Sequence, residues 1–172
     1  MKDLFWGYRL TPDGKVLDQD GTPRPIYKDP AGYLKVSLSN PNTGGQKQYW
    51  IHRLLALNFV HNPCPGVFTV VDHIDQTKNN KLSNLRWLTQ QLNVLNNSAD
   101  CVFLNKKWRK WESRVCKKTY GWFKKREDAV ACSKKHKAEL FSSIYKWHLE
   151  NYEARSWLSS SLTSNRCPLL SS

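Results

Sequence analysis

The chain has 172 residues, a formal net charge of +13 at pH 7 and 40% hydrophobic residues. The apolar content is sufficient for a folded core, which excludes a disordered polar chain. The excess of positive charge favours a polyanionic partner, most simply a nucleic acid, over a basic surface that has no partner.

No apolar run reaches the length of a signal peptide or a membrane span, so we expect a soluble protein that does not bind membranes. The five cysteines are odd in number and include no C-x-x-C pair. This pattern argues against a disulfide framework and against a structural zinc site. We therefore expect reduced thiols and an intracellular location, in the host cytoplasm, the nucleus or an organelle.

Residues 1–50 are predicted to form short antiparallel strands, a β meander interrupted by turns. Residues 11–14 read T-P-D-G, in which Pro presets one dihedral angle and Gly permits the chain to reverse. Residues 33–38 alternate apolar and polar side chains, as a half-buried strand does, and residues 48–51 begin the return strand. Lysine side chains of this sheet either contact DNA phosphates or are simply solvated: Lys28, Lys35 and Lys47.

Residues 51–60, IHRLLALNFV, are predicted to form a short buried helix, and residues 68–71 the strand that follows it. Residues 62–66, N-P-C-P-G, separate the two elements. His52 in the helix either braces the core or has a role at a phosphate or in catalysis. Arg53 has the same two interpretations and is a candidate DNA contact.

The predicted strand ends in Asp72 and His73, and a polar loop rich in Asn and Lys follows it. Residues 89–97 are the next predicted helix, in which Leu92 and Leu95 have helical spacing. A strand, a loop and a helix in this order would bring the Asp-His pair close to the Asn side chains of the helix.

This stretch resembles the HNH nuclease motif of phage and intron homing endonucleases. Residues 72–75 read D-H-I-D, residues 79–87 read N-N-K-L-S-N-L-R-W, and residues 89–93 read T-Q-Q-L-N. The H-R-L string of the preceding helix extends the resemblance back to about residue 32. The resemblance implies a ββα-metal catalytic core that hydrolyses DNA phosphodiester bonds with the help of a divalent cation.

By this resemblance His73 is the general base, a role that neutral imidazole suits near pH 7. Asp72 and Asn93 are the metal ligands, because a hard cation such as Mg²⁺ takes oxygen ligands and keeps several waters; Mn²⁺ is the alternative metal. Asn97 is the second choice for the second ligand, since it can share a helix face with Asn93. Asn84 is the middle residue of the motif, and its side chain would pin the loop so that His73 is correctly aimed.

Arg86 follows the loop and is counted among the candidate catalytic residues. Its guanidinium group has the geometry to stabilise the scissile phosphate. A structural salt bridge to an acid such as Asp75 is the alternative. Trp87, next in the chain, is predicted to be a core residue.

Residues 101–150 carry 14 Lys and Arg against 5 Asp and Glu, a net charge of +9, and are predicted to form a separate module. Strands are expected over residues 103–115 and 117–123, and a helix from Arg126 to about His148. This order, with W-x-x-x-V at residues 111–115, G-W-F at 121–123 and E-D-A-V-A at 127–131, resembles the AP2-type DNA-binding domain. The resemblance implies that the sheet enters the DNA major groove. By that analogy the candidate DNA contacts are Lys107, Arg109, Trp111, Arg114 and Lys118.

The sequence thus predicts an α+β fold with an N-terminal β meander, an HNH core and a C-terminal three-stranded sheet with a helix. The predicted segments are 1–50, 51–100, 101–150 and an extension, 151–172, that is disordered after about Leu158. The predicted function is metal-dependent, site-specific cleavage of double-stranded DNA, as in a homing endonuclease. A structure-selective nuclease, or a DNA-binding regulator with an inactive HNH fold, is the alternative. We expect no obligate protein partner and a monomer or weak dimer.

Overall fold

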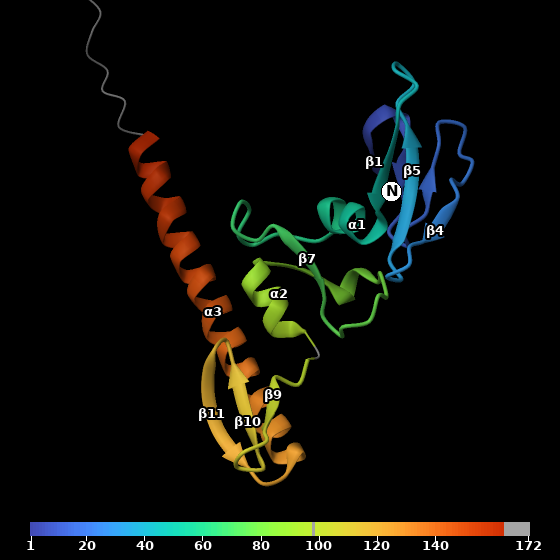
Figure 1. Ribbon diagram of the computed structural model, residues 1–172. Helices are drawn as coiled ribbons and strands as arrows, with labels where there is room; N and C mark the ends of the chain where they lie inside the picture. Colours follow the sequence, from blue (N-terminus) through green and yellow to red (C-terminus); the bar gives the residue numbers. More distant parts are fainter. Residues whose placement is uncertain (98, 164–172) are drawn as a thin grey trace, which may run out of the picture. The chain divides into compact units, whose positions relative to one another are not determined.

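The computed structural model describes residues 1–97 and 99–163 of the chain. It is a mixed α/β structure with several small antiparallel sheets and, within the described residues, three α-helices (Figure 1). The chain divides into two compact units, Met1–Asn93 and a second unit that begins at Val94. In the described part of the chain, no helix is both long and apolar enough to cross a membrane.

The first unit begins with two three-stranded antiparallel sheets. One sheet has the order β1-β2-β3, with strands Lys2–Asp3, Arg9–Leu10 and Val16–Leu17. The other has the order β4-β5-β6, with strands Ile26–Lys28, Leu34–Ser39 and Gln46–Trp50. The half-buried strand predicted over residues 33–38 is confirmed as β5, in which Val36 and Leu38 are fully buried.

Gly14 closes the predicted turn that precedes β3. Its backbone N–H donates to the carbonyl oxygen of Thr11 at 3.0 Å, and its φ of +88° is a conformation that favours glycine. A Cβ atom at this position would lie 3.1 Å from the Ile51 side chain. Glycine is therefore needed both for the reversal of the chain and for the close packing of the turn.

Helix α1, Ile51–Phe59, confirms the predicted buried helix and packs against β5 and β6. Its buried residues Ile51, Leu54 and Leu55 belong to one core, which also contains Tyr8, Leu10, Val16, Val36, Leu38 and Leu85. The predicted meander of residues 1–50 and the predicted segment of residues 51–100 therefore share one core. A helix or a sheet that is apolar on one face must bury that face against another element.

An antiparallel strand pair and a helix follow: β7, Val70–His73, β8, Leu85–Leu88, and α2, Gln90–Asn96, which crosses into the second unit. Strand β7 begins two residues later than predicted. The reason is that the N–H of Phe68 donates to the carbonyl oxygen of Cys64, at 2.8 Å, in the preceding turn. Helix α2 begins after Thr89, whose hydroxyl oxygen accepts the N–H of Leu92 at 3.2 Å and caps the helix.

The second unit contains a sheet of order β11-β10-β9, with strands β9, Val102–Asn105, β10, Lys110–Val115, and β11, Lys118–Phe123. Helix α3, Arg126–Thr163, packs on this sheet, where Val115 and Ala129 are buried. Helix α3 continues past the predicted end near His148, because residues 149–163 contain neither Gly nor Pro. It also includes the start of the segment predicted to be disordered; residues 164–172 lie outside the described part.

Candidate active site

Asp72 and Arg86 face each other across the β7–β8 strand pair. The antiparallel register places them directly opposite, and Arg86 Nε donates to Asp72 Oδ2 at 2.8 Å. The Asp72 side chain is only 8% exposed, so the guanidinium group compensates a carboxylate that is largely withdrawn from water. Of the two predicted roles for Arg86, the structure contains a salt bridge, and the acid is Asp72 rather than Asp75.

The Asn84 side chain joins the two ends of the loop between β7 and β8. Its Oδ1 accepts the backbone N–H of Asp75 at 3.0 Å, and its Nδ2 donates to Asp75 Oδ1 and to the carbonyl oxygen of Asn79, both at 2.8 Å. Asn84 itself is buried. Hydrogen bonds from Thr77 and Asn84 lower the pKa of the Asp75 carboxyl group, the Thr77 bond most strongly. The loop is thus held closed by its own polar side chains.

His73, the predicted base, is buried at the end of β7, and Asn80 orients its ring. The Nε2 atom of His73 lies 2.9 Å from Asn80 Oδ1. Because an amide oxygen only accepts hydrogen bonds, this contact requires a proton on Nε2 and leaves the lone pair of the neutral ring on Nδ1. Asn80 was not among the predicted site residues, although the adjacent Asn pair at 79–80 is visible in the sequence.

The His73 ring belongs to a cluster of aromatic rings. The rings of His52 and Tyr33 have their centroids 5.3 Å and 6.0 Å from that of His73. Tyr33 also lies 5.3 Å from His52 and 5.5 Å from Trp50. Tyr33, from the turn before β5, and His52, from α1, therefore lie next to the ring of the predicted base. Tyr33 was not a predicted site residue.

His52 is kept neutral by its position in this cluster. Burial and, to a lesser extent, repulsion from His73 and Arg53 lower the pKa of His52 from 6.5 to about 4. Its Nδ1 atom is buried and makes no hydrogen bond with the described residues. The structure therefore places His52 next to the predicted base, and it does not distinguish bracing of the core from a role at a phosphate or in catalysis.

The two predicted metal ligands lie on different elements. Asp72 is in β7, and Asn93 is a half-buried residue of α2. Asn97, the second choice, is exposed beyond the end of α2, and its Oδ1 already accepts the N–H of Ala99 at 2.8 Å. In the residues that the structure describes, no group of three or more His, Cys, Asp or Glu could hold a metal ion. A site of one carboxylate and one carboxamide oxygen does not require such a group, since waters complete the coordination of Mg²⁺.

The predicted DNA contacts of the first unit differ in how free their charges are. Lys35 lies 3.9 Å from the centroid of the Trp50 ring and 3.9 Å from an Asp29 carboxylate oxygen. Lys47, whose ammonium group lies 5.7 Å from the Tyr49 ring centroid, and Arg53, on α1, are exposed. Lys47 and Arg53 are therefore more available to a phosphate than Lys35.

The predicted contacts of the second unit fall into two groups. Lys107 and Arg109 are exposed in the turn between β9 and β10, and Lys118 is exposed at the start of β11. Arg114 is instead engaged by Glu112, through its Nε at 2.9 Å and its Nη2 at 2.6 Å. Trp111 is half-buried, with the Arg126 guanidinium 5.8 Å from its ring centroid.

No protein-family model matches the chain. Several curated proteins are similar to it. An uncharacterised HNH endonuclease of Acanthamoeba polyphaga mimivirus is 40% identical over 90 residues, which are 51% of this chain and 26% of that protein. The DNA endonuclease I-HmuI of Bacillus phage SP01 is 44% identical over 72 residues, 41% of this chain and 38% of that protein. A Bacillus subtilis (strain 168) protein assigned as an SPbeta prophage-derived HNH homing endonuclease is 37% identical over 88 residues, 50% of this chain and 49% of that protein.

A solved structure, which concerns DNA binding and cleavage by the HNH homing endonuclease I-HmuI, is similar with a TM-score of 0.47 and 34% identity. The match covers 55% of each chain. The matches to the three curated relatives named above cover less than half of the length of each relative. Over about two fifths to one half of its own length, the chain is homologous to HNH endonucleases.

Proposed function

We propose that the chain is a metal-dependent, site-specific DNA endonuclease of the HNH homing type. The observation that carries this proposal is the arrangement of the loop after β7. Asp72 and His73 are buried at the end of the strand, and Asn84 joins the two ends of the loop that follows. The similarity to HNH endonucleases supports the same function.

His73 would act as the general base. With Nε2 protonated and held by Asn80, its Nδ1 would accept the proton of a water that attacks the phosphorus atom in line. The water oxygen forms the new P–O bond, the P–O3′ bond breaks, and the O3′ atom leaves with a proton from solvent. The products are a 5′-phosphate and a 3′-hydroxyl end.

Asp72 and Asn93 would hold the cation, Mg²⁺ or Mn²⁺, which when bound polarises the phosphate and stabilises charge on the leaving oxygen. One carboxylate and one carboxamide oxygen form a donor set that fits a hard cation. The hydrogen bond that Asn97 Oδ1 accepts from the N–H of Ala99 favours Asn93 over Asn97 as the second ligand. Arg86, through its bond to Asp72, would fix the orientation of this carboxylate.

We assign β7, β8 and α2 to a ββα-metal core, and the sheet β9–β11 with α3 to an AP2-like DNA-binding module. The order of three antiparallel strands and a helix supports the second assignment. So does the net charge of +9 over residues 101–150, where 14 basic residues stand against 5 acidic ones. Neutralisation of DNA phosphates by such a module would supply most of the affinity, and would make it sensitive to salt.

The partner is double-stranded DNA, bound by a monomer or a weak dimer. A monomer would favour one nick or two sequential nicks, whereas a dimer would favour a double-strand break. An intracellular location agrees with the free thiols of Cys101, Cys116 and Cys132.

Cleavage of supercoiled plasmids that carry the gene's own flanking DNA tests the proposed function. Discrete products with Mg²⁺ that disappear with EDTA are expected, and the ratio of nicked to linear DNA reports the number of strands cut. DNA binding without cleavage in the presence of Mg²⁺ and of Mn²⁺ would instead favour the regulator with an inactive HNH fold.

A further inference from the structure

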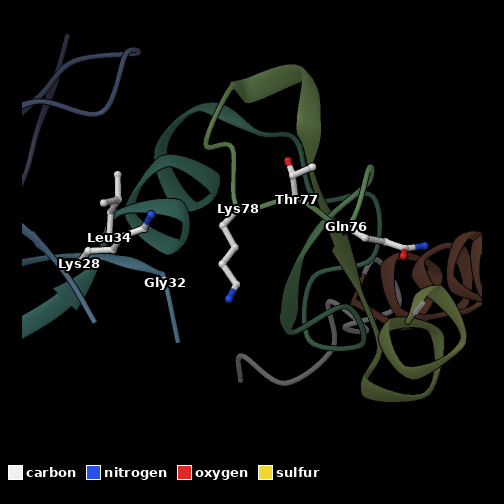
Figure 2. A pocket seen from close by; sticks show the side chains of 6 residues that line it. All are labelled: Lys28, Gly32, Leu34, Gln76, Thr77 and Lys78. Atoms are coloured by element: carbon white, nitrogen blue, oxygen red, sulfur yellow. The ribbon is translucent and has the colours of Figure 1, made fainter. Parts of the chain in front are cut away.

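Two lysines from separate segments of the first unit converge on one pocket beside the catalytic loop. The pocket has a volume of about 570 Å³ and is lined by Lys28, Gly32, Leu34, Gln76, Thr77 and Lys78. Figure 2 shows that Lys28 comes from the β4–β5 region and Lys78 from the loop that follows β7. The pocket lies entirely within the first unit.

Both lysine side chains lie close to Gly32, in the turn between β4 and β5. A Cβ atom on Gly32 would lie 3.3 Å from both Cδ and Nζ of Lys78, and 3.8 Å from Cε of Lys28. The φ of Gly32 is +90°, and its N–H donates to the Asp29 carbonyl oxygen at 2.8 Å in a tight turn. The turn therefore depends on glycine, and the missing side chain leaves room for the end of Lys78.

The positive charge of the pocket is not compensated by an acid. No lining residue is acidic, and neither Lys28 nor Lys78 forms a salt bridge with the described residues. The carboxylate of Asp29 accepts the N–H of Tyr33 at 2.8 Å and lies near Lys35, while that of Asp75 is bonded to Thr77 and Asn84. The nearest acids in the sequence are thus occupied elsewhere.

Hydrogen bonds define the conformation of the loop side of the pocket. Gln76 has a φ of +62°, which is unfavourable for a residue with a side chain. The N–H of Gln76 donates to the carbonyl oxygen of His73 at 3.0 Å, and that of Thr77 donates to Asp75 Oδ1 at 2.8 Å. Lys78 Nζ donates to the carbonyl oxygen of Ala31, which leaves two of its three N–H bonds for a ligand.

The pocket is close to the predicted base. Lys78 Nζ lies 4.5 Å from the ring centroid of Tyr33, and that centroid lies 6.0 Å from the centroid of His73. Lys78 Nζ therefore lies no further from the His73 ring centroid than these two distances together. A DNA strand rises about 3.4 Å per nucleotide along its axis, so this distance is at most roughly three such rises. A phosphate in the pocket and a phosphate at His73 can therefore belong to the same strand.

We propose that this pocket, with Lys28 and Lys78 as its cations, binds a backbone phosphate of the DNA strand close to the scissile one. The inference rests on the proposed function and adds a specific phosphate subsite to it. Lys78 is not among the predicted DNA contacts. A phosphate bound by both lysines would connect the catalytic loop to the β4–β5 strand pair. It would thereby position the DNA strand so that the scissile phosphate lies at His73.

The test measures the salt dependence of DNA binding by the full chain. Fluorescence anisotropy with a short labelled duplex in EDTA, between about 50 and 200 mM KCl, gives the slope of log K against log salt concentration. The parent protein carries His73→Ala, so that no DNA is cut. Variants on this parent are Lys28→Met/Lys78→Met, Lys28→Arg/Lys78→Arg, and the control Lys15→Met, whose lysine pairs with Asp13 on the surface.

The double Met variant should bind more weakly, with a slope less steep by about 0.9, the change expected for one neutralised phosphate. The double Arg variant should keep the parent slope, as should Lys15→Met. If thermal unfolding shows that the double Met variant is not folded, Lys28→Met alone serves, because Lys28 has no salt bridge to lose. An unchanged slope in a folded Met variant would overturn the phosphate pocket. A parent that does not bind the duplex would instead overturn the proposed function.

Discussion

Arg86 donates a hydrogen bond from Nε to Asp72 Oδ2 at 2.8 Å, across a strand pair that places the two residues directly opposite each other. The bond holds one of the proposed metal ligands and also balances the charge of a buried carboxylate. Arg86 therefore contributes to stability before any DNA or metal is bound.

Replacement of Arg86 by Met should lower the free energy of unfolding by roughly 2 kcal/mol, because a hydrogen bond to a charged group is lost and the carboxylate stays buried. Urea denaturation measures the change. The double variant Arg86→Met/Asp72→Asn should recover part of the loss, since a neutral amide costs less to bury than a carboxylate. Unaltered stability of Arg86→Met would show that the ion pair is unimportant in the folded protein.

Removal of the Asn84 side chain should open the loop after β7. Asn84→Ala deletes three hydrogen bonds in a buried site, and a loss of about 3 kcal/mol in the free energy of unfolding is expected at about 1 kcal/mol each. Asn42→Ala, at an exposed position in the loop between β5 and β6, is the matched control. Equal stabilities of the two variants would exclude the pinning role of Asn84.

His52 should make stability depend on pH in a defined window. Its pKa is lowered in the folded chain from 6.5 to about 4, so between these values the unfolded chain binds more protons. The contribution is complete above pH 6.5 and is lost as the pH falls toward 4. The difference in stability between the natural chain and His52→Gln should therefore shrink over this window. A difference that is constant with pH would contradict the position of His52; His61→Gln, at an exposed site, is the control.

The two candidates for the second metal ligand can be separated by titration with Mg²⁺. Asn93→Ala should raise the Mg²⁺ concentration needed for half-maximal cleavage by roughly tenfold or more. Asn97→Ala should cause a smaller shift, because the side-chain oxygen of Asn97 already accepts the N–H of Ala99. The opposite order of the two shifts would identify Asn97 as the ligand.

The elements around the site could be predicted because they depend on local patterns. Strand β5 follows from the alternation of apolar and polar residues, and α1 follows from the spacing of its apolar residues. The position of Asn84 follows from the fixed spacing of the motif. The environment of His73 could not be predicted in this way. Tyr33 lies 40 positions before His73, and their contact arises only when the β4–β5–β6 sheet packs in the first unit.

The partner of Arg86 illustrates the same limit at short range. Asp72 and Asp75 are both acidic and lie three residues apart, so composition does not distinguish them. The register of β7 and β8 does, because it places Asp72 opposite Arg86, while Asp75 lies in the loop and is bonded by Asn84. Registers depend on the packing of both strand faces, which a single motif does not encode.

The most direct test of the central claim compares His73→Ala with His61→Ala in plasmid cleavage with Mg²⁺. His73 is buried beside Asp72, whereas His61 is exposed outside the site. Loss of the general base should slow cleavage by His73→Ala by roughly 10²- to 10⁴-fold while DNA binding persists, and His61→Ala should cleave as the natural chain does. Cleavage by His73→Ala at a rate near that of the natural chain would contradict the assignment of His73 as the base and the HNH mechanism with it.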